Sequence, residues 1–150
     1  LPPVDNEPPA QEIGPMARAL VAFGKMRLAA DKIDHGAPRP QAEPGPTRAY
    51  GEVLATVCTG CHGPDLSGGP IPGGEPGWPP AANITPHEKT GIGGWSKEEF
   101  VTAMTEGVRP DGSRVREPMP WKLYSKMKSD DLEALWKYLQ TVEPRPFGNR

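Results

Sequence analysis

Five residues near the middle of the chain, Cys58-Thr59-Gly60-Cys61-His62, constrain the fold more than any other stretch. Two cysteines separated by two residues and followed directly by a histidine form the attachment pattern of a c-type haem. Each thiol adds to one vinyl group of the porphyrin, and the imidazole then becomes the proximal ligand of the iron. The motif predicts one covalent haem c, with Cys58 and Cys61 as tethers and His62 as a metal ligand.

Three other chemistries use a Cys-x-x-Cys pair. A structural zinc site takes four protein ligands, and the remaining histidines, His35 and His87, have no paired spacing. A thioredoxin-like dithiol requires a βαβ setting, and the sequence shows no alternating strands. A disulfide between the two cysteines is possible but leaves the adjacent histidine unexplained. The haem interpretation accounts for all three side chains.

Glycine and proline are abundant along the whole chain. There are 18 Gly and 21 Pro among 150 residues, about twice the ordinary share. Such a composition allows a few helices separated by long irregular loops, and both cysteines lie in the motif, so no disulfide framework can brace those loops. We therefore predict an all-α fold with long Gly/Pro-rich loops around one haem, together with an N-terminal helical arm.

Charge and hydropathy exclude two classes of partner. The formal net charge is −2 and no basic patch is present, so nucleic acid is not expected to bind. No run of about 18 apolar residues occurs, so the sequence predicts no membrane-spanning helix. The chain begins with Leu1-Pro2-Pro3, which leads us to expect a mature or trimmed chain. Membrane association would then arise only through an absent anchor or through a partner.

The sequence divides into two predicted parts. Residues 1–46 form a Pro-rich arm that contains one helix, expected over residues 16–30, and a linker over residues 36–46. We interpret this helix as packing on the haem domain rather than as a docking element for a partner or a membrane surface. Residues 47–150 form the haem domain, which begins at Thr47 as a helix N-cap.

Three helices are predicted in the haem domain. The first leads into the cysteine motif with an apolar face made of Tyr50, Val53, Leu54 and Val57. The second spans about residues 97–106, with a capping box at its start and Gly107 as its stop. The third opens at Ser129, places Leu132, Leu135, Trp136, Leu139 and Val142 in a buried stripe, and is ended by Pro144.

Residues 63–80 are too rich in glycine and proline to form regular structure. A ligating histidine usually donates its second ring N–H to a carbonyl or a carboxylate. We expect a backbone carbonyl of this loop, near Pro70 or Pro72, to fill that role for His62.

The second axial ligand of the iron has five candidates. They are Met119, Met104, Met127, His87 and His35. We favour Met119 because Pro118 and Pro120 fix its backbone on both sides, and a thioether raises the reduction potential relative to a second imidazole.

Several other side chains are expected near the haem. Four aromatic residues flank the loops that should close on the porphyrin: Trp95, Trp121, Trp78 and Tyr124. An aromatic ring that packs on these loops would also contact the haem, so packing and haem contact are nearly one prediction. Arg109 faces either a propionate or water.

Together with the haem motif, a series of short segments resembles the bacterial mono-haem class I cytochromes c, particularly the cytochrome c domains in subunits of membrane-associated dehydrogenases. These segments are Asn83-Ile84-Thr85-Pro86, Gly91-Ile92-Gly93, Trp95-Ser96, Phe100, residues 107–112, Met119-Pro120-Trp121 and residues 130–139. The resemblance covers about residues 47–143. It implies a class I cytochrome c fold whose first and last helices cross, an edge-exposed haem attached outside the cytoplasm, and His–Met ligation with Met119 as the methionine.

The function expected on these grounds is one-electron transfer in the periplasm or on the extracytoplasmic face of the membrane. The donor would be a dehydrogenase or a respiratory complex, and the acceptor an oxidase or a reaction centre. Two alternatives stay open. One is a haem enzyme or gas sensor with a labile sixth ligand. The other is a cytochrome subunit of a larger respiratory or dehydrogenase complex. The sequence favours an electron carrier or electron-transfer subunit over an enzyme.

Overall fold

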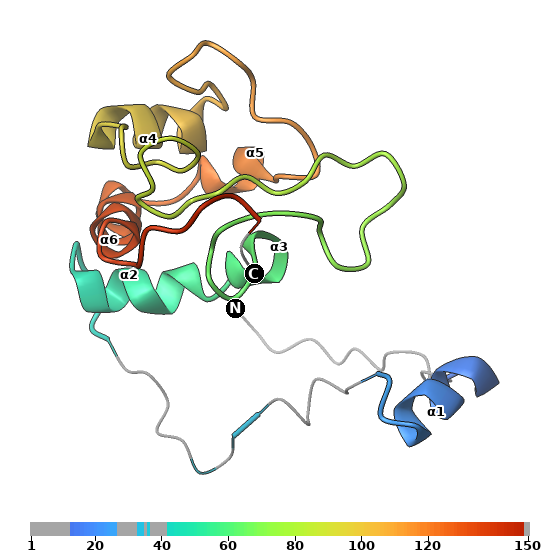
Figure 1. Ribbon diagram of the computed structural model, residues 1–150. Helices are drawn as coiled ribbons and strands as arrows, with labels where there is room; N and C mark the ends of the chain where they lie inside the picture. The colour runs from blue at the N-terminus through green and yellow to red at the C-terminus, as the bar shows by residue number, and fades with distance from the viewer. Residues whose placement is uncertain (1–12, 27–32, 35, 37–41, 149–150) are drawn as a thin grey trace, which may run out of the picture. The chain divides into compact units, whose positions relative to one another are not determined.

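The structure, a computed structural model, describes residues 13–26, 33–34, 36 and 42–148. It has two compact units, Leu1–Arg39 and Pro40–Arg150 (Figure 1). Within the described residues the regular structure consists of six α-helices with no β-strand, and two isolated bridges are the only strand-like pairings. The predicted all-α class is confirmed, while the domain boundary between residues 46 and 47 stays a prediction.

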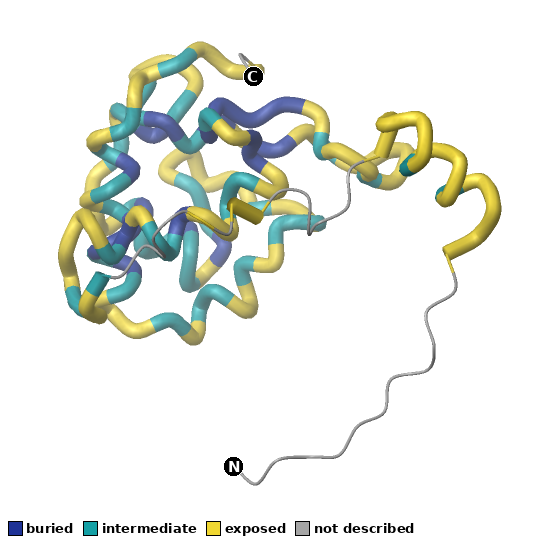
Figure 2. The backbone as a smooth tube through the Cα atoms, turned by 90° about the horizontal axis from the view of Figure 1, so that it is seen from below, coloured by how far each residue is buried: buried dark blue, intermediate teal, exposed yellow. Residues whose placement is uncertain are grey.

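The N-terminal unit contains one helix, α1 (Pro15–Ala22). Pro15 occupies its first position, where a missing N–H costs nothing. Gly24 ends it with φ +66, and the N–H of Lys25 reaches back to the carbonyl of Leu20 at 2.8 Å. The prediction of a helix extending beyond Ala22 through residues 23–26 was therefore wrong, and residues 27–30 lie outside the described residues. No residue of α1 is buried (Figure 2).

The second unit is built on the contact between α2 (Arg48–Ala55) and α6 (Ser129–Leu139), the most extensive pairing among the described helices. Thr47 caps α2 by accepting the Tyr50 N–H at 3.2 Å, as predicted. Gly51 and Ala55 are the buried residues of α2. A Cβ on Gly51 would overlap the carbonyl of Ala134, so the two helix backbones touch at this point.

The predicted apolar face of α2 is only partly right, because Leu54 packs against the core cluster while the contact with α6 uses Gly51 and Ala55. Val57 is 67% exposed, and Tyr50, Val53 and Leu54 are only half-buried. The close approach of α6 selects the smallest side chains for the contact, and periodicity of large apolar residues does not reveal such a face.

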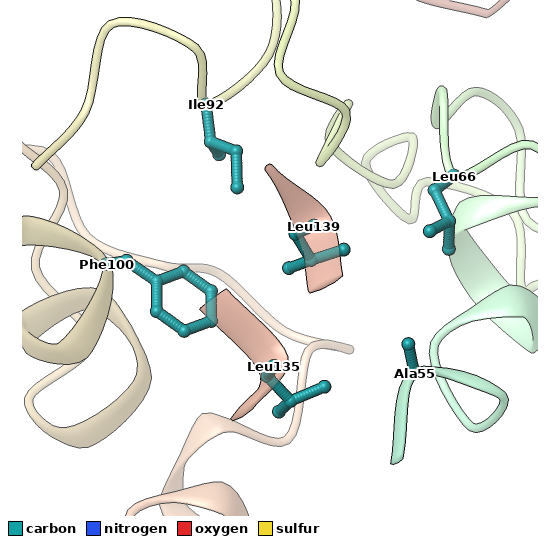
Figure 3. Close-up of a cluster of buried hydrophobic side chains, with 6 residues drawn as sticks. All are labelled: Ala55, Leu66, Ile92, Phe100, Leu135 and Leu139. Atoms are coloured by element: carbon teal, nitrogen blue, oxygen red, sulfur yellow. The ribbon is translucent and has the colours of Figure 1, made fainter. Parts of the chain in front are cut away.

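A cluster of six side chains forms the core of this unit (Figure 3). It draws on α2, the loop after the cysteine motif, the segment before α4, α4 (Lys97–Thr105) and α6. Its members are Ala55, Leu66, Ile92, Phe100, Leu135 and Leu139. The Phe100 ring also meets the Trp136 ring at a centroid distance of 5.5 Å. The predicted capping box of α4 is present, with Ser96 and Glu99 bonded reciprocally.

Two short helices complete the unit. These are α3 (Thr59–His62) and α5 (Trp121–Tyr124). A one-turn helix carries little periodic signal, and α5 was not predicted. The last helix begins at Ser129 as predicted but ends at Leu139, before Pro144, so the proline does not stop it. No helix among the described residues has both the length and the apolar character needed to cross a membrane.

One ion-pair network joins α4 to α6. Glu133 lies 2.7 Å from Lys137 and 3.5 Å from Lys97. The hydrogen bond and charge of Lys137, and then the charge of Lys97, lower the pKa of the Glu133 carboxyl. A carboxyl with a lowered folded-state pKa stabilises the fold above its unfolded pKa and loses that contribution as the pH falls through the folded value.

The helix contact at Gly51 yields the first prediction. We expect Gly51→Ala to lower the unfolding free energy of the mature protein by about 1–3 kcal/mol, because the added methyl must displace the α6 backbone. Gly60→Ala is the matched control, since a Cβ at that position meets nothing within 4 Å. Thermal unfolding followed by circular dichroism measures both variants. Equal melting temperatures would contradict the proposed backbone contact.

Glu133→Gln tests the network between α4 and α6. At pH 6–7 we expect this variant to melt about 1–3 °C below the native chain, a small effect because the pairs are partly exposed. The difference should shrink as the pH falls towards 3, where Glu133 of the native chain becomes protonated. Melting curves at several pH values test this. A difference that persists unchanged at the acidic end would show that the charge of Glu133 is not responsible.

Candidate functional site

The cysteine motif forms α3 and the residue before it. The helix starts where α2 ends, since the Cys58 N–H donates to the Ala55 carbonyl at 2.9 Å and the His62 N–H donates to Cys58 at 2.9 Å. Gly63, at φ +84, turns the chain away directly after His62. Cys58 is half-buried, Cys61 is exposed, and His62 is 7% exposed. No disulfide joins the two cysteines.

The imidazole of His62 is oriented by a backbone carbonyl. Its Nδ1 lies 2.7 Å from the oxygen of Ala82. A carbonyl only accepts, so Nδ1 carries the proton and the neutral ring keeps the lone pair of Nε2, as an iron ligand requires. The prediction of a backbone carbonyl was right, but its placement near Pro70 or Pro72 was wrong. The loop of residues 63–80 extends past the His62 ring, and the carbonyl that accepts from the ring belongs to Ala82, two residues after the loop.

The segment that contains Ala82 is tied to the residues after His62. Gly69 and Ala81 exchange two backbone hydrogen bonds of 2.9 Å, and Ile84 donates to Leu66 at 2.9 Å. The Gly68 N–H donates to the carbonyl of His62 itself at 2.8 Å. The histidine and its acceptor therefore belong to one hydrogen-bonded structure.

Met119 lines a cavity of about 400 Å³. Its backbone is held on both sides, because its N–H donates to Arg116 at 3.2 Å and its carbonyl accepts from Trp121 at 2.9 Å. Met104 and Met127 pack instead against the buried cluster of Figure 3.

Of the two histidines considered as the second axial ligand, only His87 lies within the described residues. His87 is half-buried, and its Nδ1 lies 3.0 Å from the Thr90 hydroxyl within a tight turn. His35 lies outside the described residues.

The aromatic and arginine side chains predicted to lie near the haem are found in three places. Trp121 lines the same cavity as Met119, as does Trp78. Trp95 is half-buried and packs against the core cluster. Arg109 is half-buried in the predicted turn, where its guanidinium lies 3.5 Å from the Ser113 hydroxyl. The structure thus brings Met119, Trp121 and Trp78 together, and keeps Trp95 and Arg109 apart from that cavity.

Tyr124 of α5 connects this region with the cysteine motif. Burial raises the pKa of the Tyr124 phenol, and the charges of Cys58 and Cys61 raise it further. Burial also raises the pKa of the Cys58 thiol, with Cys61 adding to the effect. The short helix that follows Met119 therefore lies within electrostatic reach of both thiols.

The donor set fits a covalently attached haem. Two thiols and an imidazole with a fixed tautomer occupy one turn, next to a buried apolar cluster that Cys58 itself contacts. A helical domain with this arrangement is characteristic of c-type haem proteins.

Comparison with known proteins agrees with this class. The family model for cytochrome c matches residues 49–143. The chain belongs to the cytochrome c family, and this domain transfers electrons through a covalently bound haem.

Among its relatives are three dehydrogenase subunits. The fructose dehydrogenase cytochrome subunit of Gluconobacter japonicus is 32% identical over 115 residues, covering 71% of this chain and 24% of the relative. The gluconate 2-dehydrogenase cytochrome c subunit of Pantoea cypripedii is 36% identical over 109 residues, covering 67% and 24%. The cytochrome c subunit of alcohol dehydrogenase (quinone) from Gluconobacter oxydans (strain 621H) is 32% identical over 108 residues, covering 67% and 22%. The matched region spans about a quarter of the length of these relatives.

The packing of Trp121 yields a prediction about the Met119 segment. A Cβ on Gly107 would lie 2.6 Å from Cε2 of Trp121, so we expect Gly107→Ala to displace this ring and the adjoining Met119. Gly112→Ala is a matched control, because Gly112 has a similar φ of +78 against +67 but open space around it. Near-ultraviolet circular dichroism should change far more for Gly107→Ala. Equal spectra of the two variants would argue against contact between Trp121 and the Gly107 backbone.

Proposed function

We propose that this chain is a one-electron carrier with a single haem c, tethered by Cys58 and Cys61 and ligated by His62 and Met119. The chain has two cysteines, both in the motif, which supports one haem. The observation that carries the proposal is the buried His62 ring, whose Nδ1–H donates to the Ala82 carbonyl as expected of a metal-ligating imidazole.

Met119 is the proposed second ligand because its setting differs from that of the other methionines. Its backbone is fixed by two hydrogen bonds and it borders a cavity, whereas Met104 and Met127 are engaged in packing. A preorganised loop loses little entropy when its side chain binds a metal.

When bound, the haem supplies a one-electron change between ferric and ferrous iron. The chain contributes two sulfur tethers, a fixed imidazole and a thioether. It also contributes apolar side chains in two places, since Trp121 borders the cavity beside Met119 and Trp95 packs on the core cluster. Arg109 is proposed to neutralise a haem propionate. The residue is half-buried, and its guanidinium contacts the hydroxyl of the exposed Ser113, so a charged group could reach it.

We propose a dehydrogenase as the electron donor and an extracytoplasmic location, with a respiratory protein as the acceptor. Three relatives are cytochrome subunits of dehydrogenases, and the matched region spans about a quarter of their length. The chain would then serve either as a separate carrier or as one haem module of such a subunit. Electron-transfer partners usually dock through small, transient interfaces.

Met119→Ala tests the ligand assignment. We expect the oxidised native protein to show a sulfur-to-iron charge-transfer band that this variant lacks. The reduction potential should fall by on the order of a tenth of a volt or more, because a thioether favours ferrous iron. Met127→Leu is the control and should retain both the band and the potential. A band that survives in Met119→Ala and disappears in Met127→Leu would move the ligand to Met127.

Carbon monoxide separates a carrier from a haem enzyme or a gas sensor. The reduced native protein is expected to bind it slowly or not at all, since both axial positions are filled. Met119→Ala is expected to bind it readily. Rapid stoichiometric binding by the native protein would contradict the carrier proposal.

A further inference from the structure

The carbonyl of Ala82, which accepts from His62 Nδ1, is positioned by two features that the haem motif does not include. The backbone of Gly68 packs against this carbonyl, and the side chain of Asn83 fixes the residue that follows it. Both belong to segments joined by the backbone hydrogen bonds between residues 66–69 and 81–84.

Gly68 packs directly against the Ala82 peptide. A Cβ built on Gly68 would lie 2.6 Å from both the carbonyl carbon and the oxygen of Ala82. Gly68 also has a φ of +79, and its N–H donates to His62. A side chain at this position would push against the atom on which the orientation of the histidine depends.

The Asn83 amide is 3% exposed and fully used. Its Oδ1 accepts from the Thr85 N–H at 2.9 Å and from the Thr85 hydroxyl at 2.8 Å. Its Nδ2 donates to the Arg145 carbonyl at 2.6 Å and to the Thr90 hydroxyl at 3.0 Å. Two donors and two acceptor positions are thus satisfied, which fixes the peptide that follows Ala82.

The C-terminal segment is bonded to the same two segments. The Arg145 N–H donates to the Thr85 hydroxyl at 3.2 Å, and the Arg145 guanidinium lies 3.3 Å from Asp65. The Gly148 N–H donates to Ser67 at 3.0 Å. These contacts come from residues beyond position 143, where the match to the cytochrome c family ends.

We propose that Gly68 and Asn83 are positioning residues that set the strength of the His62–Ala82 hydrogen bond and, through it, the reduction potential of the haem. This inference rests on the proposed function. A short Nδ1–H···O bond makes the imidazole a stronger donor and favours ferric iron, which lowers the potential. Loosening the carbonyl weakens the bond and raises the potential.

Gly68→Ala is the first test, carried out on the mature haem protein. Its reduction potential should be more positive than that of the native protein. In the reduced protein, the His62 Nδ1 proton followed by NMR should exchange with D2O about fivefold faster, the factor that corresponds to losing one neutral hydrogen bond. Gly73→Ala is the matched control, because Gly73 has a similar φ of +71 but nothing within 4 Å. It should leave both quantities at native values.

Asn83→Ala tests the second positioning residue and should change both quantities in the same directions. If this variant yields no mature protein, Thr90→Ala decides, because it removes one partner of Nδ2 from an exposed position. It should give smaller shifts of the same sign. Gly51→Ala controls for lost stability, since it perturbs the α2–α6 contact without touching this network.

The results distinguish this inference from the proposed function. A native potential and native proton exchange in Gly68→Ala and in the Asn83 or Thr90 variant would overturn the positioning role, even with the sulfur-to-iron band intact. Absence of that band from the native protein would instead refute ligation by Met119, which belongs to the proposed function, and would leave the test of the His62–Ala82 hydrogen bond unaffected.

Discussion

The hydrogen bond between His62 and the carbonyl of Ala82 is the interaction on which the site depends. It selects the ring nitrogen that remains for a metal and orients the ring within a buried setting. The loop of residues 63–80 has almost no regular structure, yet its two ends are brought together by the backbone hydrogen bonds between Gly69 and Ala81 and between Ile84 and Leu66. An irregular loop can therefore hold the acceptor of a ligating histidine in place, because hydrogen bonds fix the residues at the two ends of the loop.

Close approach of backbone to neighbouring atoms recurs through the haem unit. Gly51 lets α2 meet the α6 backbone, Gly68 lets the chain lie against Ala82, and Gly107 lets Trp121 pack on the end of α4. The buried cluster is small, with one alanine, one isoleucine, three leucines and one phenylalanine, and a bound porphyrin would supply the apolar volume that side chains do not. These three glycines therefore allow close contacts that any larger residue would prevent.

Much of this arrangement was predictable where local chemistry determines it. Two helix starts were predictable because they depend on side-chain hydrogen bonds within three residues, made by Thr47 and by Ser96 with Glu99. The cysteine motif was predictable because its residue spacing alone indicates haem attachment. Ala82 could not be identified as the acceptor, since any residue can offer a carbonyl and only the path of the loop selects one. The buried face of α2 was missed because its contact uses the small residues Gly51 and Ala55. The early end of α1 was missed because the surrounding residues favour helix, although Gly24 ends it.

The central claim is that Cys58 and Cys61 carry one haem beside His62. It is tested most directly by mass spectrometry of the peptide that contains residues 58–62, released by proteolysis from protein matured with haem-attachment machinery. The account predicts this peptide at the mass of its amino acids plus one haem, bound through both sulfurs. A peptide found at the mass of its amino acids alone, or with the two cysteines joined as a disulfide, would contradict it.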